Sequence, residues 1–164
     1  MRSIHHTGIT VSDLDRSIDF YHDVLGLEFA AEPSPVVDDP DLGDKVGVPG
    51  AKLRLVTFAI GDGLLELLQY IEPPSPIATP LRQSALGAQH VALRVDDVAE
   101  TVARLTARGV EFLSDVTAVD DGVLAGWRWV YFRDPDGILL ELVEIAYERP
   151  EERRAAIAAF EAAR

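Results

Sequence analysis

Two histidines and two glutamates stand at matching places in the two halves of this chain, and together they could bind a metal ion. His6 and His90 each open a run of alternating, β-rich residues, which predicts a strand. Glu66 and Glu141 each lie in the middle of an apolar run. A carboxylate in such a strand is costly to bury unless it is paired or bound to a cation. The repetition of both features indicates a shared purpose.

The donor types narrow the chemistry of such a site. The chain has no cysteine, so disulfides, thiolate ligands and cysteine nucleophiles are excluded. Two imidazoles and two carboxylates suit one divalent ion of Zn, Ni, Co, Fe or Mn, with room for water. The sequence leaves open whether the site forms within one chain or across a dimer. His5 and His22 are interpreted as ordinary structural histidines, because a lone strand or helix histidine is more often hydrogen-bonded than ligating.

The elements that would position these residues occur twice in the same order. After each histidine strand comes an acidic or hydroxyl residue suited to cap a helix, and each predicted helix ends at a glycine, Gly26 or Gly109. A hairpin follows over residues 54–70 and again over residues 127–144, with turn residues between the strands. Each half therefore reads as β-α-β-β-β. Apolar residues recur at helical spacing in both halves. They are Leu14, Ile18, Tyr21, Val24 and Leu25 in the first half, and Val98, Val102 and Leu105 in the second.

Period-two alternation assigns faces to the predicted strands. His6 and Thr10 share a face, and Glu66 shares one with Leu68 and Tyr70. In the second half, the apolar residues Val91, Leu93 and Val95 point to the side opposite His90. Three aromatic residues share a face on the strand beside Glu141. Core or interface packing is the first interpretation of these aromatic residues, and stacking on an acyl or aromatic group is the alternative. They are Trp127, Trp129 and Tyr131.

Composition limits the class of protein and its partners. The 164 residues are 48% hydrophobic, enough for one globular domain with a real core. The formal net charge of −13 disfavours nucleic acid as a partner. No apolar stretch approaches membrane-spanning length, so we expect no membrane partner and a cytoplasmic location. The polar insertion with prolines and glycines at residues 33–50 predicts a loop over a pocket or a disordered flap, whose role is open. The Ala-, Glu- and Arg-rich segment at residues 150–164 predicts a C-terminal helix.

The motifs resemble those of the vicinal-oxygen-chelate superfamily, which includes glyoxalase I and methylmalonyl-CoA epimerase. The resemblance covers about residues 4 to 145. It implies an α+β fold in residues 1–149, with two βαβββ modules, about 4–71 and 89–145, forming a cupped, barrel-like mixed sheet with helices outside. A small-molecule substrate and a homodimer are also implied. The matching stretches are His6-Thr-Gly-Ile-Thr-Val-Ser-Asp-Leu, Glu66-Leu-Leu, His90-Val-Ala-Leu-Arg-Val-Asp-Asp and Asp134-Pro-Asp-Gly-Ile-Leu-Leu-Glu141-Leu.

The resemblance places the family's metal ligands on His6, Glu66, His90 and Glu141, and having all four is most similar to the isomerase and lyase branches. A metal-dependent isomerase or lyase that moves a proton beside a carbonyl is therefore expected. Glu66 and Glu141 would be its catalytic residues, with Glu141 the first choice as base. A dioxygenase using Fe(II) or Mn(II) is the first alternative. A resistance protein that sequesters a small molecule is the second.

Two positions depart from the glyoxalase I pattern. That enzyme has an arginine where this chain has Thr10, and an asparagine where it has Tyr70, so the resemblance does not support a glutathione substrate. The turn Asp134-Pro-Asp-Gly is nevertheless similar to glyoxalase I. The residues joining the modules, with Glu66-Leu-Leu before them, are more similar to the epimerase.

Overall fold

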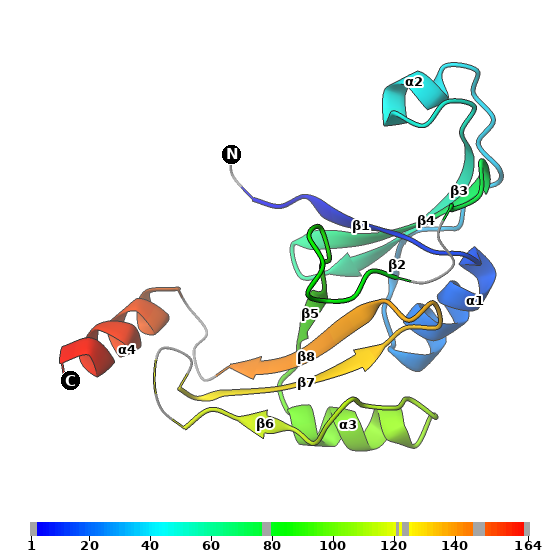
Figure 1. The fold of residues 1–164 in the computed structure, drawn as a ribbon. Helices are drawn as coiled ribbons and strands as arrows, with labels where there is room; N and C mark the ends of the chain where they lie inside the picture. Colours follow the sequence, from blue (N-terminus) through cyan, green and yellow to red (C-terminus); the bar gives the residue numbers. More distant parts are fainter. Residues whose placement is uncertain (1–2, 77–79, 121, 123–124, 146–149, 163–164) are drawn as a thin grey trace. The chain divides into compact units, whose positions relative to one another are not determined.

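The computed structural model describes residues 3–76, 80–120, 122, 125–145 and 150–162. It divides the chain into two compact units (Figure 1). The first unit is Met1–Pro80 together with Asp134–Gly137, and the second is Leu81–Arg133 together with Ile138–Arg164. Each unit holds one copy of the sequence repeat. The exception is the turn Asp134–Gly137, which joins two strands of the second unit but belongs to the first.

The first unit is a four-stranded mixed sheet with two short helical segments and a π-helix. Its strand order is β1-β4-β3-β2, in which β1 runs parallel to β4 and the other neighbours are antiparallel. The elements are β1 (His6–Thr10), α1 (Leu14–Ile18), the π-helix η1 (Asp19–Val24), β2 (Phe29–Ala31), α2 (Leu42–Val46), β3 (Lys52–Ile60) and β4 (Gly63–Glu72).

The second unit repeats this plan. Its strand order β5-β8-β7-β6 has the same parallel pair at one edge and the same antiparallel neighbours. The predicted α+β class with two βαβββ modules is therefore confirmed. The elements are β5 (Val91–Arg94), α3 (Val98–Thr106), β6 (Thr117–Ala118), β7 (Trp127–Arg133), β8 (Leu139–Ile145) and α4 (Pro150–Ala162). None of the helices in the described ranges has the length and apolar character needed to cross a membrane.

An aspartate caps the first helix of each unit in the same way. Asp13 accepts a hydrogen bond from the backbone N–H of Arg16, and Asp97 accepts one from Glu100. Both aspartates have the extended backbone that helix caps adopt. The sequence predicts an acidic or hydroxyl cap at the start of each helix, and the structure assigns this role to Asp13 and Asp97.

A second polar contact ties each helix to its sheet. The Gln69 side chain on β4 accepts from the backbone N–H of Leu14, at 3.1 Å. Glu144 on β8 accepts from Val98 in the same manner, at 2.9 Å. These N–H groups have no partner inside their helices. The strand side chains satisfy them and so fix where each helix begins relative to its sheet.

The first helix differs from the prediction in its second half. The apolar spacing from Leu14 to Leu25 predicts one α-helix, but the segment continues as a π-helix from Asp19. Both helix types keep one side of the segment apolar over this length, so the spacing could not separate them. The segment still ends as predicted, with Gly26 in the left-handed region at φ 85°, and Gly109 ends α3 at φ 87°.

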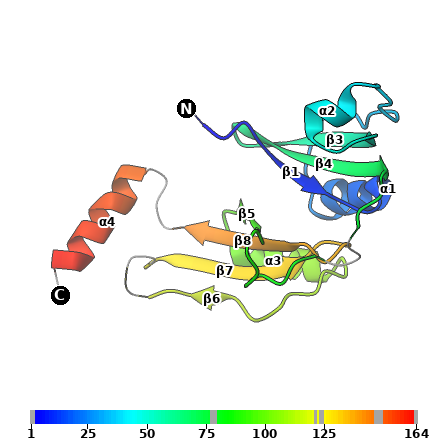
Figure 2. The ribbon, with the colours of Figure 1, turned by 45° about the horizontal axis from the view of Figure 1, so that its top comes forward.

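The core of each unit lies between the helix and one face of the sheet. Helix α1 packs against β3 and β4 (Figure 2), and α3 packs against β7 and β8. An aromatic pair closes each core at an equivalent position, with ring centroids 5.3 Å apart for Phe29–Phe58 and 5.5 Å for Phe112–Phe132. The buried apolar residues include Leu14, Tyr21, Val56, Leu65 and Leu67 in the first unit, and Val98, Leu105, Val130, Leu140 and Leu142 in the second.

The inserted segment at residues 33–50 is docked on its sheet. Ser34 and Val37 donate backbone hydrogen bonds to Leu55 and Leu53 of β3, each at 2.8 Å. The segment therefore extends the sheet edge before forming α2. The sequence predicts either a loop over a pocket or a disordered flap for this segment. In the structure, these backbone hydrogen bonds hold it in a defined place beside β3.

Candidate functional site

The first histidine–glutamate pair lies on neighbouring parallel strands. His6 is on β1 and Glu66 on β4, with His6 Nε2 3.9 Å from Glu66 Oε2. Gly8 is the residue paired directly with Glu66. A Cβ atom at Gly8 would lie 3.5 Å from Glu66 Oε2, an ordinary van der Waals contact, and 3.3 Å from Leu68 Cδ1. The Glu66 side chain keeps 23% of its surface exposed and is only loosely held by its neighbours.

His5 contacts His6 from the side away from Glu66. The two Nδ1 atoms are 2.9 Å apart, and the rings meet edge to face. One of these nitrogens must carry the proton for a hydrogen bond to exist. When the proton is on His6 Nδ1, the lone pair of His6 Nε2 is left for a ligand on the Glu66 side.

The second pair repeats this geometry more tightly. His90 stands just before β5, Glu141 lies on β8, and His90 Nε2 is 3.1 Å from Glu141 Oε2. Ala92 is paired with Glu141, as Gly8 is with Glu66. The register is therefore the same in both units. The Glu141 side chain is only 10% exposed, so this carboxylate is held in a much drier setting.

The side chains of Gln83 and Tyr131 contact His90 and Glu141 and restrict their orientation. The Gln83 amide lies 3.1 Å from His90 Nδ1, which leaves His90 Nε2 as the nitrogen that faces Glu141. The Tyr131 ring meets the His90 ring edge to face at 5.3 Å, and its hydroxyl donates to Glu141. Burial and the nearby Glu141 carboxylate raise the pKa of Tyr131, so it stays a donor. Trp129 packs on Tyr131.

The distance between histidine nitrogen and glutamate oxygen in each pair is compatible with both atoms binding one metal ion. Two donors held at about 2.0–2.2 Å from one metal ion lie roughly 3–3.5 Å apart. The 3.1 Å of the second pair meets this value, and the 3.9 Å of the first pair is within a small side-chain adjustment. Among the described residues, no group of three or more His, Asp or Glu side chains is gathered closely enough to hold a metal ion. Each unit thus brings together two side chains, one imidazole and one carboxylate.

His22 lies outside this arrangement. Its Nδ1 is 2.7 Å from the carbonyl oxygen of Leu27, and its ring stacks on Phe29 at 4.4 Å. Gln83, in contrast, contacts the candidate site at His90, and the sequence did not point to it. It lies in the irregular join between the modules, where neither periodicity nor the repeat gives a signal.

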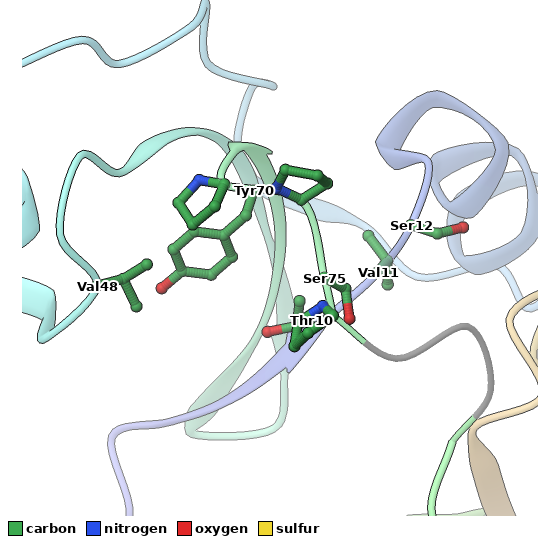
Figure 3. Close-up of a pocket in the computed structure, with 9 residues that line it drawn as sticks. Thr10, Val11, Ser12, Val48, Tyr70 and Ser75 are labelled. Atoms are coloured by element: carbon green, nitrogen blue, oxygen red, sulfur yellow. The ribbon is translucent and has the colours of Figure 1, made fainter.

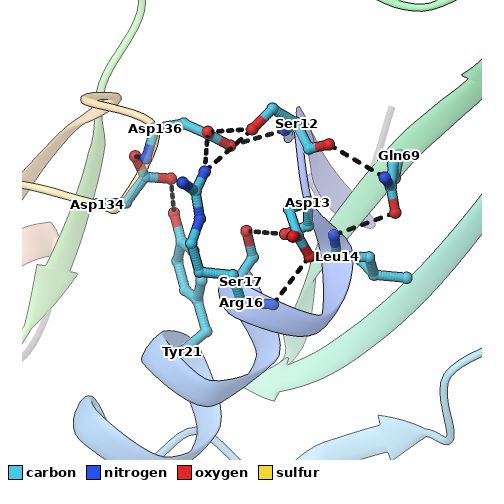
Figure 4. A network of polar contacts seen from close by, with 9 residues as sticks. All are labelled: Ser12, Asp13, Leu14, Arg16, Ser17, Tyr21, Gln69, Asp134 and Asp136. Carbon is cyan, nitrogen blue, oxygen red and sulfur yellow. Dashed lines mark hydrogen bonds and ion pairs between the residues drawn. The ribbon is translucent and has the colours of Figure 1, made fainter.

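A polar network joins the turn Asp134–Gly137 to the start of α1 (Figure 4). Asp136 accepts from the backbone N–H of Ser12 at 2.7 Å and from its hydroxyl at 2.5 Å, and it also pairs with Arg16. The buried Tyr21 hydroxyl donates to Asp134 at 3.1 Å. Burial raises the pKa of Tyr21, and the Asp134 carboxylate adds to that shift. The sequence identified this segment as a turn within a family-like motif, but it did not predict the contacts with Ser12, Arg16 and Tyr21.

Comparisons with known proteins agree on one family. The sequence profile of the Glyoxalase/Bleomycin resistance protein/Dioxygenase superfamily matches residues 3–142. The chain is 33% identical to a 2-epi-5-epi-valiolone epimerase of Actinomyces sp, over 97% of this chain and 88% of that protein. It is 32% identical to the mouse mitochondrial methylmalonyl-CoA epimerase, over 85% and 71%. A glyoxalase family protein of Bacillus cereus has a similar structure, with a TM-score of 0.73 and 26% identity over 88% and 94%.

Proposed function

Because this chain belongs to the Glyoxalase/Bleomycin resistance protein/Dioxygenase superfamily, we propose that it is a divalent-metal-dependent isomerase or lyase. Its ligands would be His6, Glu66, His90 and Glu141. The observation that carries the proposal is the repeated geometry, in which each sheet brings one imidazole to one carboxylate at the same register. Epimerases among the relatives support a reaction that moves a proton.

The donor set fits a first-row divalent ion. Two imidazoles and two carboxylates suit Zn, Ni, Co, Fe or Mn, and charge favours binding because two anionic ligands balance a doubly charged ion. When bound, the ion would act as a Lewis acid for negative charge that develops on a substrate oxygen. The two pairs would come together within one chain or across a homodimer, and a metal-loaded monomer in solution would establish the first case.

The two glutamates would be the catalytic residues. Removing a proton from the carbon beside a carbonyl needs a base, and inverting that carbon needs a proton returned to its opposite face. One carboxylate from each half of the molecule supplies both needs. Glu66, the more exposed and less restrained, has the freedom to approach and leave the substrate. Glu141 is fixed between His90 and Tyr131 and would act from a set position.

Metal content tests the ligand set. Elemental analysis after loading with each candidate ion should find one ion per site in the wild type. Glu66→Gln and Glu141→Gln should each weaken binding by roughly 100-fold, since each removes an anionic ligand. Glu28→Gln, at an exposed glutamate outside the pairs, is the matched control. Unchanged metal content in both ligand variants would contradict the proposal.

Isotope exchange tests the reaction. In deuterated water, the loaded enzyme should introduce deuterium beside the carbonyl of a substrate drawn from 2-oxo compounds, cyclic ketones and acyl thioesters. Each glutamine variant should lose inversion by about 100- to 10,000-fold, the usual size of an acid–base contribution. A variant that still exchanges the proton without inverting the carbon would identify the remaining glutamate as the base. Oxygen uptake with no exchange across the panel would instead favour a dioxygenase.

A further inference from the structure

A pocket of about 350 Å³ opens at the ends of β1 and β4, within the first unit (Figure 3). Three prolines of the segment after β4 form much of its wall, and Val48 reaches it from the docked insertion. Thr10 and the Tyr70 ring border the same hollow. At the small end of the range for ligand sites, this volume suits a single ring rather than a nucleotide. The prolines are Pro73, Pro74 and Pro76.

The pocket continues the strand face that carries the first histidine–glutamate pair. Thr10 lies four residues beyond His6 on β1, and Tyr70 lies four residues beyond Glu66 on β4, so alternation keeps them on one side. Four residues of strand span about 13 Å. A substrate that reacts at Glu66 and extends this far along the strands would place its distal part in the pocket.

The pocket offers no cation to an anionic group. None of the lining residues is charged. Every lysine and arginine in the described residues of the first unit already has a carboxylate partner. A carboxylate or phosphate entering here would lose water without gaining a counterion, which is unfavourable. The pairs are Arg16–Asp136, Lys45–Asp39, Lys52 with Asp38 and Glu72, and Arg54–Asp15.

The lining does offer flat apolar surfaces beside hydroxyl groups. The Tyr70 ring and the pyrrolidine rings can cover the C–H face of a bound ring. The hydroxyls of Thr10 and Tyr70 can exchange hydrogen bonds with the ring's own hydroxyls. Ser12 takes no part, because its hydroxyl is already held by Asp136 and Arg16.

We infer that this pocket binds an uncharged, hydroxylated ring, and that it selects substrates whose distal part is such a ring over those ending in a carboxylate or phosphate. Only the statement that the ring belongs to the substrate rests on the proposed function. The pocket's preference for a neutral ring follows from its own lining and from the paired cations around it.

The test compares two probes that share one ring. Methyl β-D-glucoside is neutral, and methyl β-D-glucuronoside carries a carboxylate in place of its hydroxymethyl group. Binding to the full chain is followed by NMR titration in the presence of a chelator, so no bound metal is needed. The neutral probe should bind saturably, with shifts at Thr10 and Tyr70, and about tenfold more tightly than the anionic one.

Three variants locate the effect. Tyr70→Ala should weaken the neutral probe by about tenfold and Tyr70→Phe by about threefold, since the first loses the ring and the second only its hydroxyl. Thr10→Arg, at an exposed position, should reverse the preference toward the anionic probe. Thr106→Ala, exposed on α3 of the second unit, is the matched control.

Equal or tighter binding of the glucuronoside by the wild type would overturn the inference, as would saturable binding of neither probe. Neutral-ring binding together with a failed metal-content assay would remove the proposed function and leave the pocket assignment standing. Metal binding without a preference for the neutral ring would remove the pocket assignment alone.

Discussion

The two units share the same backbone topology and differ in the side chains at equivalent positions. Both have the same strand order, the same aspartate cap and the same side-chain contact from strand to helix. Beside the glutamate, however, the first unit has Thr57 and the second has Tyr131. Register and caps fix the backbone, so they cannot vary without moving the helix. Side chains on the helix-free face can vary, and there the two halves have diverged.

The cores differ at one equivalent position. Tyr21 in the first unit and Leu105 in the second are both fully buried, yet only Tyr21 carries a hydroxyl that needs an acceptor. Asp134 supplies it. The first unit therefore depends on a carboxylate from a distant part of the chain, whereas the corresponding place in the second unit is satisfied by packing alone.

Removing that carboxylate should have the largest effect on stability. Asp134→Ala leaves the Tyr21 hydroxyl buried without its acceptor and also frees the backbone N–H of Asp136. We expect a loss of about 3 kcal/mol in the free energy of unfolding, measured by urea denaturation. Tyr21→Phe combined with Asp134→Ala should cost less than the sum of the two single variants. Additive losses would show that the pair does not act as a unit.

The aromatic residue beside Glu141 should affect metal affinity more than its counterpart beside Glu66. Tyr131→Phe removes the hydroxyl that donates to Glu141, and we expect metal binding to weaken by roughly tenfold, as for other groups that orient a ligand. Thr57→Val, at the equivalent place, should change affinity by less than about twofold. Competition with a chromogenic chelator measures both. Equal effects would remove the distinction between a fixed and a loosely held carboxylate.

The shared contacts from strand to helix should show the smallest and most similar effects. Gln69→Leu and Glu144→Leu each leave a helix N–H without its side-chain acceptor, and each should cost about 1 kcal/mol. Gln89→Leu, at an exposed residue of the join, serves as control and should stay near the wild-type midpoint in urea. A large difference between the two variants would mean that the duplicated contact has lost its role in one unit.

The sequence predicted the parts of this structure that depend on local pattern. Alternation and repetition were enough to predict that His6 and Glu66 occupy places in the first half equivalent to those of His90 and Glu141 in the second, and the structure brings each histidine close to the glutamate of its own half. They could not reveal Gln83 against His90 or Gln69 against Leu14, because such contacts join segments whose approach no local rule describes. The same holds for Asp136. Turn chemistry explains why residues 134–137 bend, but not that their carboxylates reach Ser12 and Arg16.

The turn Asp134–Gly137 packs with the first unit, and this affects how the chain folds during its synthesis. Residues 134–137 complete the first unit, yet they leave the ribosome long after residues 1–80. Until then, Tyr21 has no acceptor for its hydroxyl and Arg16 no counterion. The buried polar groups of the N-terminal half therefore gain their partners only once the C-terminal half is present. A fragment ending at Pro80 would lack these contacts and be less stable than its hydrophobic core alone predicts.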